Sequence, residues 1–400
     1  MATPHISTRA GHPDFLDLEW DRSITEWDPD RLADLPAGIH RHEIVFVPYR
    51  HDIYAIKELP LSVARHEYEM LREFRDRDVP SVTPVGFVER PWVDPTEEWS
   101  GAVITRYVSY AFPYRELISG GGFGQRRTQM LDAFAGLLVE LHLAGCFWGD
   151  CSLSNVLYRY DAGSIDAIMI DAETSAVHDE LTTGQRLEDI EIMKINVAGG
   201  MADIAASQGL EFDDADLELG EDIAARYQGL WSELSQEVIV GENEHYRIAE
   251  RVARLNGLGF EVGEVELIPD DGGNRLRLRA RVGARTFHKT RLRELTRIDA
   301  AEHQAKQILA DLRYHEAKFA PETASGKAIA AIQWRVSVFE PMLERIKAAL
   351  PPGANPVQGY TDFLHHRYVL ASEAGHDMDN EVAFESWVAA GKPGYPLPEV

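Results

Sequence analysis

Three oxygen-bearing side chains in the middle of the chain have the types and spacing of a phosphoryl-transfer site. Asn155 is the fifth residue after Asp150, and a mainly apolar run over residues 165–170 is followed by Asp171. A carboxylate can orient an acceptor hydroxyl, while an amide oxygen and a second carboxylate are suitable Mg²⁺ ligands. We therefore predict that Asp150 is a catalytic residue and that Asn155 and Asp171 bind magnesium beside the phosphates of ATP.

The elements around these residues support this prediction. The apolar spacing of residues 131–141 predicts a helix that ends at Gly145, and residues 156–158 predict a short strand. Asp171 follows a second strand at hairpin distance. A polar loop that merely caps a hairpin is the structural alternative.

A lysine is expected on a strand upstream, where it would hold phosphates. Residues 52–59 predict such a strand, on which Ala55 and Lys57 share one face because side chains alternate with a period of two. They match the Val-Ala-Ile-Lys pattern, in which the alanine contacts adenine and the lysine binds phosphates. A lysine that snorkels from an edge strand is the alternative.

The helix predicted after this strand supplies an acidic partner for the lysine. We expect Ser62 to cap it and the helix to continue to about Arg75. Glu67 shares a helix face with apolar residues, whereas its rival Glu69 shares a face with Arg72 and Glu73, which indicates a solvated stripe. We therefore predict that Glu67 pairs with Lys57.

Together these motifs resemble a known family. Lys57, Glu67, the Leu141-His142-x-x-Gly145 turn, Gly149-Asp150, Asn155 and Asp171 resemble the lipopolysaccharide-kinase-like branch of the protein-kinase-like fold. The Gly-Asp-x4-Asn loop is also similar to that of aminoglycoside phosphotransferases. The whole chain resembles an actinobacterial family in which such a domain, here about residues 30–235, precedes a C-terminal domain of unknown function. The resemblance implies an α+β fold with two kinase lobes and an additional C-terminal α/β domain, with ATP and Mg as cofactors.

Departures from the family pattern concern nucleotide binding. The segment Leu35–Val47 contains one glycine where a glycine-rich loop would cradle phosphates. Either His40, Arg41 and His42 help to bind the phosphates, or nucleotide binding is weak.

Other departures concern the acceptor. Gly149 stands where protein kinases have an arginine, Asp171 is followed by Ala172-Glu173, and no Ala-Pro-Glu motif follows. Little platform for docking a peptide remains, which favours a small-molecule, lipid or sugar acceptor. We expect Asp189 to brace the catalytic loop.

Three functions are compatible with these residues. The leading hypothesis is an ATP- and Mg-dependent phosphotransferase acting on a hydroxyl group. The second is a catalytically weak, nucleotide-binding pseudokinase scaffold that regulates a partner through the C-terminal domain, and the third is nucleotidyl transfer. The set of Lys57, Glu67, Asp150, Asn155 and Asp171 favours the enzyme, whereas the missing glycine loop favours the scaffold.

Composition limits the class of protein. A chain of 400 residues with 44% hydrophobic content can build two or three cores, and its net charge of −26 argues against broad binding to nucleic acid or anionic membranes. No run approaches the length of a membrane span. The two cysteines, Cys146 and Cys151, are interpreted as packing thiols of a cytoplasmic protein, with a regulatory disulfide as the alternative.

We expect four regions: an N-terminal lead-in over residues 1–30, an N-lobe over 31–105, a C-lobe over 106–240 and the C-terminal domain over 241–400. Residues 102–108 predict a hinge strand that holds adenine. The glycine-rich residues 120–124 are interpreted as a flexible connection, because no lysine and no preceding apolar strand accompany them.

The C-terminal region contains the one concentrated basic surface. A hairpin turn is predicted at residues 270–274, and in the following strand Arg275, Arg277, Arg279 and Arg281 alternate with apolar residues, so they line one face. Two interpretations remain open: a solvated face that pairs with the acidic kinase lobe, or an anion site for a phosphorylated ligand or nucleic acid.

The histidines near the end of the chain are a weaker candidate for a site. His365 and His366 are adjacent and are followed by Asp377 and Asp379, which are possible metal ligands. Neighbouring residues on a helix point in different directions, so packing and helix capping are the preferred interpretation.

Overall fold

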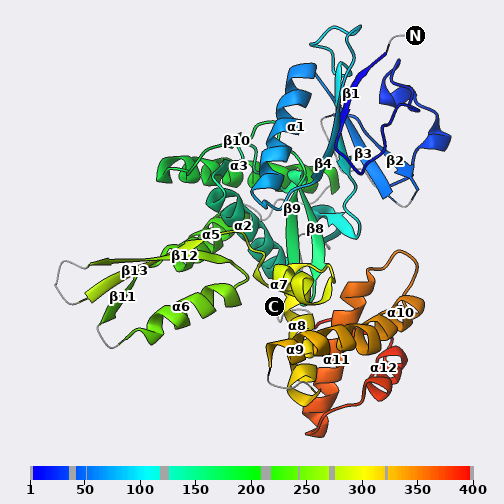
Figure 1. Cartoon of the computed structure of the whole chain (residues 1–400). Helices are drawn as coiled ribbons and strands as arrows, with labels where there is room; N and C mark the ends of the chain where they lie inside the picture. The colour runs from blue at the N-terminus through cyan, green and yellow to red at the C-terminus, as the bar shows by residue number, and fades with distance from the viewer. Residues whose placement is uncertain are drawn as a thin grey trace. The chain divides into compact units, whose positions relative to one another are not determined.

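The computed structural model describes residues 3–35, 42–50, 52–117, 126–208, 218–241, 244–269, 275–319 and 323–396 (Figure 1). These residues form two compact units, Met1–Tyr158 with Ala167–Leu230, and Arg159–Asp166 with Trp231–Val400. Among the helices that the structure describes, none combines the length and the apolar character needed to cross a membrane.

The first unit begins with an antiparallel sheet of five strands in the order β1-β4-β5-β3-β2. The strands are β1 His5–Thr8, β2 Ile44–Tyr49, β3 Asp52–Leu59, β4 Thr83–Glu89 and β5 Gly101–Arg106. Strand β3 lies between β2 and β5. Its Tyr54 and Ile56 are buried in the apolar core on one face of the sheet, and Lys57, on the other face, is 12% exposed.

The expected lead-in is an integral part of this sheet. Strand β1 pairs with β4, and the segment after it, with short 3₁₀ helices at Ile24–Glu26 and Pro29–Arg31, packs Phe15, Trp20 and Trp27 into the apolar core. Glu58 of β3 anchors the segment, because its Oε1 accepts a hydrogen bond from Ile24 N at 3.1 Å. The same carboxylate forms a buried ion pair of 2.6 Å with Arg90.

Helix α1, Leu61–Asp76, covers one face of the sheet and contacts β4 and β5. The prediction that Ser62 caps this helix is wrong. The cap position is Pro60, two residues before Ser62, and the proline side chain offers no hydrogen-bond acceptor. The free N–H of Leu61 is satisfied instead by Ser100 Oγ, 2.9 Å away.

The second lobe of this unit is mainly helical. Its helices are α2 Arg127–Leu143, α3 Thr183–Gln208 and α5 Leu219–Ser235, the last of which continues across the boundary between the units. Short strands lie among them: β6 Ala111–Pro113, β7 Cys146–Phe147, β8 Val156–Asp161, β9 Ser164–Met169 and β10 Ala176–Val177, with 3₁₀ turns at Tyr114–Leu117 and Leu153–Asn155. A sheet followed by a mainly helical lobe is the α+β, two-lobed architecture expected from the sequence.

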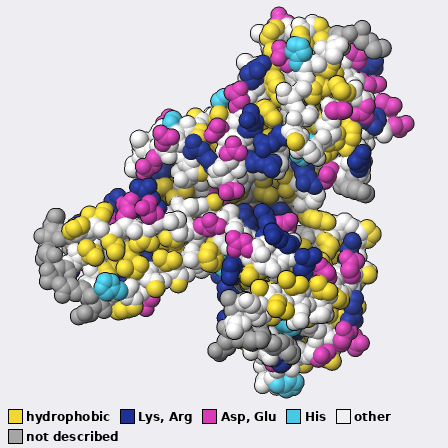
Figure 2. All heavy atoms as spheres, in the orientation of Figure 1, with side chains coloured by type: hydrophobic (Ala, Val, Ile, Leu, Met, Phe, Trp, Pro, Cys, Tyr) yellow, Lys and Arg dark blue, Asp and Glu magenta, His cyan; other side chains and the backbone are white. Residues whose placement is uncertain are grey.

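The second unit combines a small sheet with a helical domain. The sheet has the order β11-β13-β12, with β11 Val238–Gly241, β12 Val262–Pro269 and β13 Arg275–Val282, and helix α6 Tyr246–Gly257 packs on it. The predicted hairpin is present as the antiparallel pair of β12 and β13, although its turn at residues 270–274 lies outside the described residues. Hydrophobic side chains gather over this region in Figure 2, among them the exposed Ile239, Leu267 and Ile268.

The helical domain has one core. Its helices are α7 Phe287–Thr296, α8 Glu302–Phe319, α9 Ala324–Trp334, a π-helical turn Arg335–Phe339, α10 Glu340–Ala349, α11 Pro356–Ala374 and α12 Asn380–Ala389. Trp334, Tyr360, Phe363 and Trp387 are completely or almost completely buried in this core. The expected helix capping near the C-terminus is confirmed for Asp379, which accepts the N–H of Glu381 at 2.8 Å.

Residues of the hairpin between β8 and β9 belong to this second unit. The buried Asp161 carboxylate accepts the backbone N–H groups of His303 at 2.9 Å and Gln304 at 2.6 Å. These are N–H groups of the first turn of α8, which have no acceptor within their own helix. Asp161 therefore acts as an N-terminal cap from a distant part of the chain.

Candidate active site

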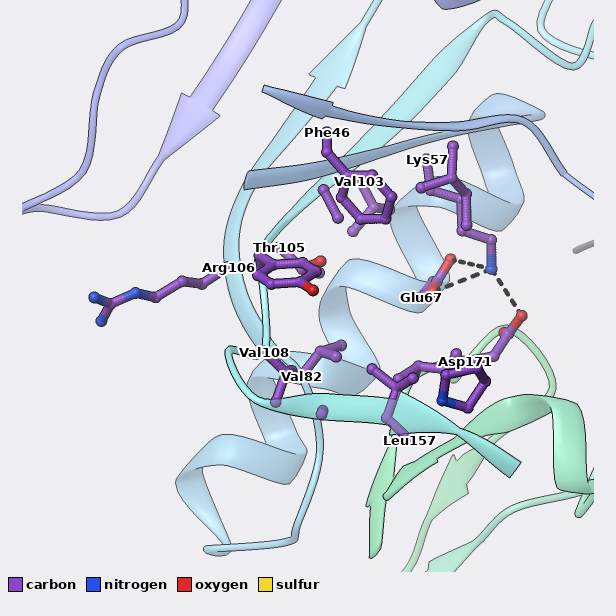
Figure 3. A pocket seen from close by; sticks show the side chains of 16 residues that line it. Phe46, Lys57, Glu67, Val82, Val103, Thr105, Arg106, Val108, Leu157 and Asp171 are labelled. Carbon is purple, nitrogen blue, oxygen red and sulfur yellow. Dashed lines mark hydrogen bonds and ion pairs between the residues drawn. The ribbon is translucent and has the colours of Figure 1, made fainter. Parts of the chain in front are cut away.

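An apolar pocket lies in the first unit against strands β2, β3 and β5 of the sheet (Figure 3). Ala55 of β3 lines it, as the sequence pattern predicted, and the expected hinge supplies Thr105, Tyr107 and Val108. Its other lining residues are Ile44, Phe46, Lys57, Glu67, Val82, Val103, Arg106, Ala111, Pro113, Leu157, Ile170 and Asp171. The pocket is thus mostly apolar, with charged groups gathered at one place.

Lys57 joins two carboxylates from distant elements. Its Nζ lies 3.2 Å from Glu67 Oε2 on α1 and 2.8 Å from Asp171 Oδ2, which follows β9 (Figure 3). Glu67 is on the buried face of its helix, whereas the rival Glu69 is exposed. Glu67, on the buried face of α1, is thus the acid that contacts Lys57, as its position on the helix predicted. The parts these residues take in nucleotide binding stay predictions.

Burial sets the electrostatics of this cluster. Burial acts to lower the pKa of Lys57, but the charges of Glu67 and Asp171 outweigh it and the pKa rises, so the ammonium stays charged. Burial raises the pKa of Glu67 to about 7 against the opposing attraction of Lys57. The ammonium is therefore a fixed positive charge at the end of an apolar pocket, which is the property a phosphate-binding group needs.

The loop that carries Asp150 follows α2. The loop bends at Gly145 and Gly149, which have φ angles of +76° and +80°. A Cβ atom would collide with the carbonyl oxygen of His178 at Gly145 and with that of Thr174 at Gly149. Asp189 of α3 braces the loop as predicted, because its carboxylate accepts Trp148 N at 2.7 Å and Gly149 N at 2.8 Å. Asp189 is completely buried.

Two amides hold the Asp150 carboxylate. Asn155 Nδ2 donates to Asp150 Oδ2 at 3.1 Å, and Asn196 Nδ2 of α3 donates to Asp150 Oδ1 at 2.8 Å. Asn155 is also tied to the strand before Asp171, since Ile170 N donates to its carbonyl oxygen at 3.0 Å. The structure thus brings Asp150 and Asn155 together and links them to the segment of Asp171. Sequence analysis missed Asn196, because no local pattern marks it.

Sequence analysis named His42, just before β2, as a possible phosphate-binding residue but did not predict its acidic partners. His42 lies between two acids, with Nδ1 2.8 Å from Glu98 Oε2 and Nε2 3.2 Å from Glu173 Oε2. Glu173 contributes to the electrostatic environment of Lys57. His40 and Arg41, also expected near phosphates, lie outside the described residues, as do residues 120–124.

The two cysteines beside this loop are free and buried. Burial raises the pKa of the Cys146 thiol to about 12 and also raises that of Cys151. Cys151 Sγ donates to Asp189 at 3.3 Å. Both thiols are therefore protonated packing groups of the loop.

The basic face of β13 is matched by acids of its own sheet region. Arg279 lies 2.7 Å from Glu237 Oε1 and Arg277 lies 3.4 Å from Glu237 Oε2. Arg281 contacts Glu266 at 2.8 Å. These contacts favour the solvated face over the anionic site among the two interpretations of the sequence.

Comparison with protein families separates two segments of the chain. Residues 43–209 match the model of the lipopolysaccharide kinase (Kdo/WaaP) family, and residues 229–391 match a domain of unknown function, DUF4032. Residues 43–209 are similar to the lipopolysaccharide kinase family, and we call them the lipopolysaccharide-kinase-like domain. The family match supports a phosphotransferase, and the domain holds every residue of the predicted site.

Solved structures and curated proteins give less information. The chain is similar to WaaP in complex with acyl carrier protein, with 15% identity over 57% of this chain and 91% of that one and a TM-score of 0.34. It is also similar to a Rio2 kinase complex with ADP, Mg²⁺ and phosphoaspartate from Chaetomium thermophilum, with 14% identity, coverage of 50% and 71%, and a TM-score of 0.31. No curated protein matches the sequence.

Proposed function

We propose that the lipopolysaccharide-kinase-like domain transfers the γ-phosphoryl group of Mg-ATP to a hydroxyl group of a small-molecule, lipid or sugar acceptor. One observation carries this proposal: the charged cluster of Lys57, Glu67 and Asp171 lies at an apolar pocket of the kind that takes a nucleotide base. Ala55 and the hinge would contact the adenine, and Lys57 would bind the phosphates.

The residues present fit a magnesium ion that is shared with the nucleotide. Because Asn155 donates its Nδ2 to Asp150, its Oδ1 is the atom available to a cation, and Asp171 offers carboxylate oxygens. Within the described residues, no group of three or more His, Cys, Asp or Glu could hold a metal alone. This suits Mg²⁺, which commonly binds one or two protein ligands together with phosphates. When bound, the ion would neutralise the charge of the phosphates.

Asp150 would act on the acceptor. Its carboxylate is held by two donors that carry no charge, and it would accept the hydrogen bond of an acceptor hydroxyl. Only residues 172–182 separate Asp171 from α3, and β10 occupies part of them. So short a segment supports an acceptor smaller than a folded protein.

The test separates nucleotide binding from turnover. Asp171→Ala should lose most Mg-ATP affinity in calorimetry, because a cation ligand is removed, whereas Asp150→Asn should bind Mg-ATP like the parent. In a screen of metabolites, sugars and lipids with labelled ATP, Asp150→Asn should lose most transfer, by about 10²-fold or more. Asp179→Ala, an exposed change in the same segment, is the control.

Other results would change the proposal. Equal Mg-ATP affinity in the parent and Asp171→Ala would refute the assigned part of Asp171. Tight Mg-ATP binding by the parent without transfer or hydrolysis would favour the pseudokinase scaffold, which the single glycine before β2 also supports. Transfer of a nucleotide instead of phosphate would indicate nucleotidyl transfer.

A further inference from the structure

Asn196 lies on the same helix as the residue that braces the catalytic loop. Asp189 and Asn196 are seven residues apart on α3, or about two turns, so they share one helix face. Met193 and Val197, beside this face, are completely buried, which fixes the rotation of the helix. Asp189 holds the backbone of Trp148 and Gly149, and Asn196 holds the side chain of the next residue, Asp150.

The hydrogen bond from Asn196 completes the support of Asp150. Asn155 alone binds one carboxylate oxygen, Oδ2, which leaves the carboxylate free to turn about its last torsion. With Asn196 Nδ2 2.8 Å from Oδ1, each oxygen has its own donor and the carboxylate plane is set. Each oxygen keeps a further lone pair for an acceptor hydroxyl.

The chemical type of the donor also matters. Lys57 pairs with Asp171 through a full positive charge, which would hold a carboxylate by neutralising it. An amide instead donates an N–H group and brings no net charge. A carboxylate that must attract the proton of a hydroxyl needs orientation without neutralisation, and an asparagine supplies this.

We infer that Asn196 is a positioning residue that orients Asp150 for phosphoryl transfer. This inference rests on the proposed function. Removal of its N–H group should lower kcat and leave the binding of Mg-ATP unchanged, since Asn196 does not line the nucleotide pocket.

The experiment uses the full chain, Mg-ATP as substrate and water as acceptor, and records kcat and KM for hydrolysis. Asn196→Asp, of equal shape, replaces the donor by a second carboxylate, and Asn196→Leu removes it. We expect kcat to fall by about 10²-fold with Asp and somewhat less with Leu, and KM for ATP to stay within about twofold. Asn196→Gln, which keeps an amide donor, should restore part of the rate.

Two controls separate this effect from a general loss of structure. Ile195→Asp adds the same charge at the adjacent position, which is 71% exposed, and should behave like the parent. In an Asp150→Asn background, Asn196→Leu should cause no further loss, because the acceptor of the hydrogen bond has already changed.

The outcomes distinguish the inference from the proposed function. If Asp150→Asn abolishes hydrolysis but Asn196→Asp and Asn196→Leu keep the parental kcat, the positioning role is wrong and the proposed function stands. A rise in KM that accompanies unfolding, without rescue by glutamine, would assign Asn196 a merely structural role. If the parent shows neither hydrolysis nor transfer in the metabolite screen, or if Asp150→Asn leaves hydrolysis unaffected, the proposed function is wrong and this inference with it.

Discussion

Strands β3 and β13 both place basic side chains on one face of an antiparallel sheet, but they use them differently. Lys57 on β3 is 12% exposed and contacts acids from α1 and from the segment after β9. Arg281 on β13 is 68% exposed and contacts glutamates on the neighbouring strand. Both strands lie between two others in their sheets, so cover by other elements decides this difference. Lys57 is covered by α1 and by the segment after β9, whereas Arg279 and Arg281 of β13 face solvent.

The comparison shows why a basic pattern alone does not identify a ligand site. Where the groups are buried, a cation among several acids creates a strong local electrostatic field, because little water screens the charges. On an exposed strand, acids of the same sheet region take up the charge, and each contact contributes little.

Lys57→Met should have the largest effect. The variant removes the cation that pairs with Glu67 and Asp171, so the phosphates of ATP would meet these two acids without its compensation. We expect Mg-ATP affinity to fall by about 10³-fold in calorimetry, near the upper range for loss of one partner of a buried charge pair. Lys194→Met, which breaks ion pairs on α3, should bind like the parent. Unchanged affinity in Lys57→Met would show that the pocket does not use this charge.

The pairing of Lys57 shows what could be predicted from the sequence. The period of two along β3 and the apolar face of α1 are local, so they identified Lys57 and chose Glu67 over Glu69. The loop around Asp150 was likewise predicted from its spacing.

What sequence analysis missed depends on contacts between distant segments. Asn196 and the pair of His42 with Glu173 come from elements without a shared motif. The aromatic residues of the N-terminal segment follow no regular period, so their place in the sheet core was not predicted. The glutamate partners of the arginines depend on the order of three strands, which a single alternating pattern does not contain.

Glu67→Gln should change the pH dependence of stability. The Glu67 carboxyl group has an ordinary pKa of 4.5, which applies to the unfolded chain, and burial raises its pKa to about 7 in the folded protein. Between these values the folded state retains a proton that the unfolded state has lost. Stability contributed by this group is therefore present below pH 4.5 and is lost as pH rises to about 7, by up to about 3 kcal/mol.

The measurement is the free energy of unfolding in urea from pH 4 to 8. The parent should show this decline, and Glu67→Gln should lack it, while Asp171 continues to compensate Lys57. Glu69→Gln, on the exposed face of the same helix, should retain the parental profile. A decline of equal size in the parent and Glu67→Gln would mean that another group titrates, and a parent stability that rises over this range would reverse the assigned sign.

Replacing Arg275, Arg277, Arg279 and Arg281 by serine should have the smallest effect. The contacts of this face with Glu237, Glu264 and Glu266 are largely solvated, so each should contribute at most about 1 kcal/mol, and the loss should diminish at high salt. Mg-ATP affinity should not change. Because glutamates already pair with Arg277, Arg279 and Arg281 and the chain carries a net charge of −26, we expect no binding of heparin or RNA near physiological salt. Urea unfolding and heparin titration across a salt series measure both effects, with Arg291→Ser and Arg293→Ser on α7 as the control. Salt-dependent heparin binding by the parent that the serine variant alone loses would instead establish the anionic site on β13 and remove the contrast with β3.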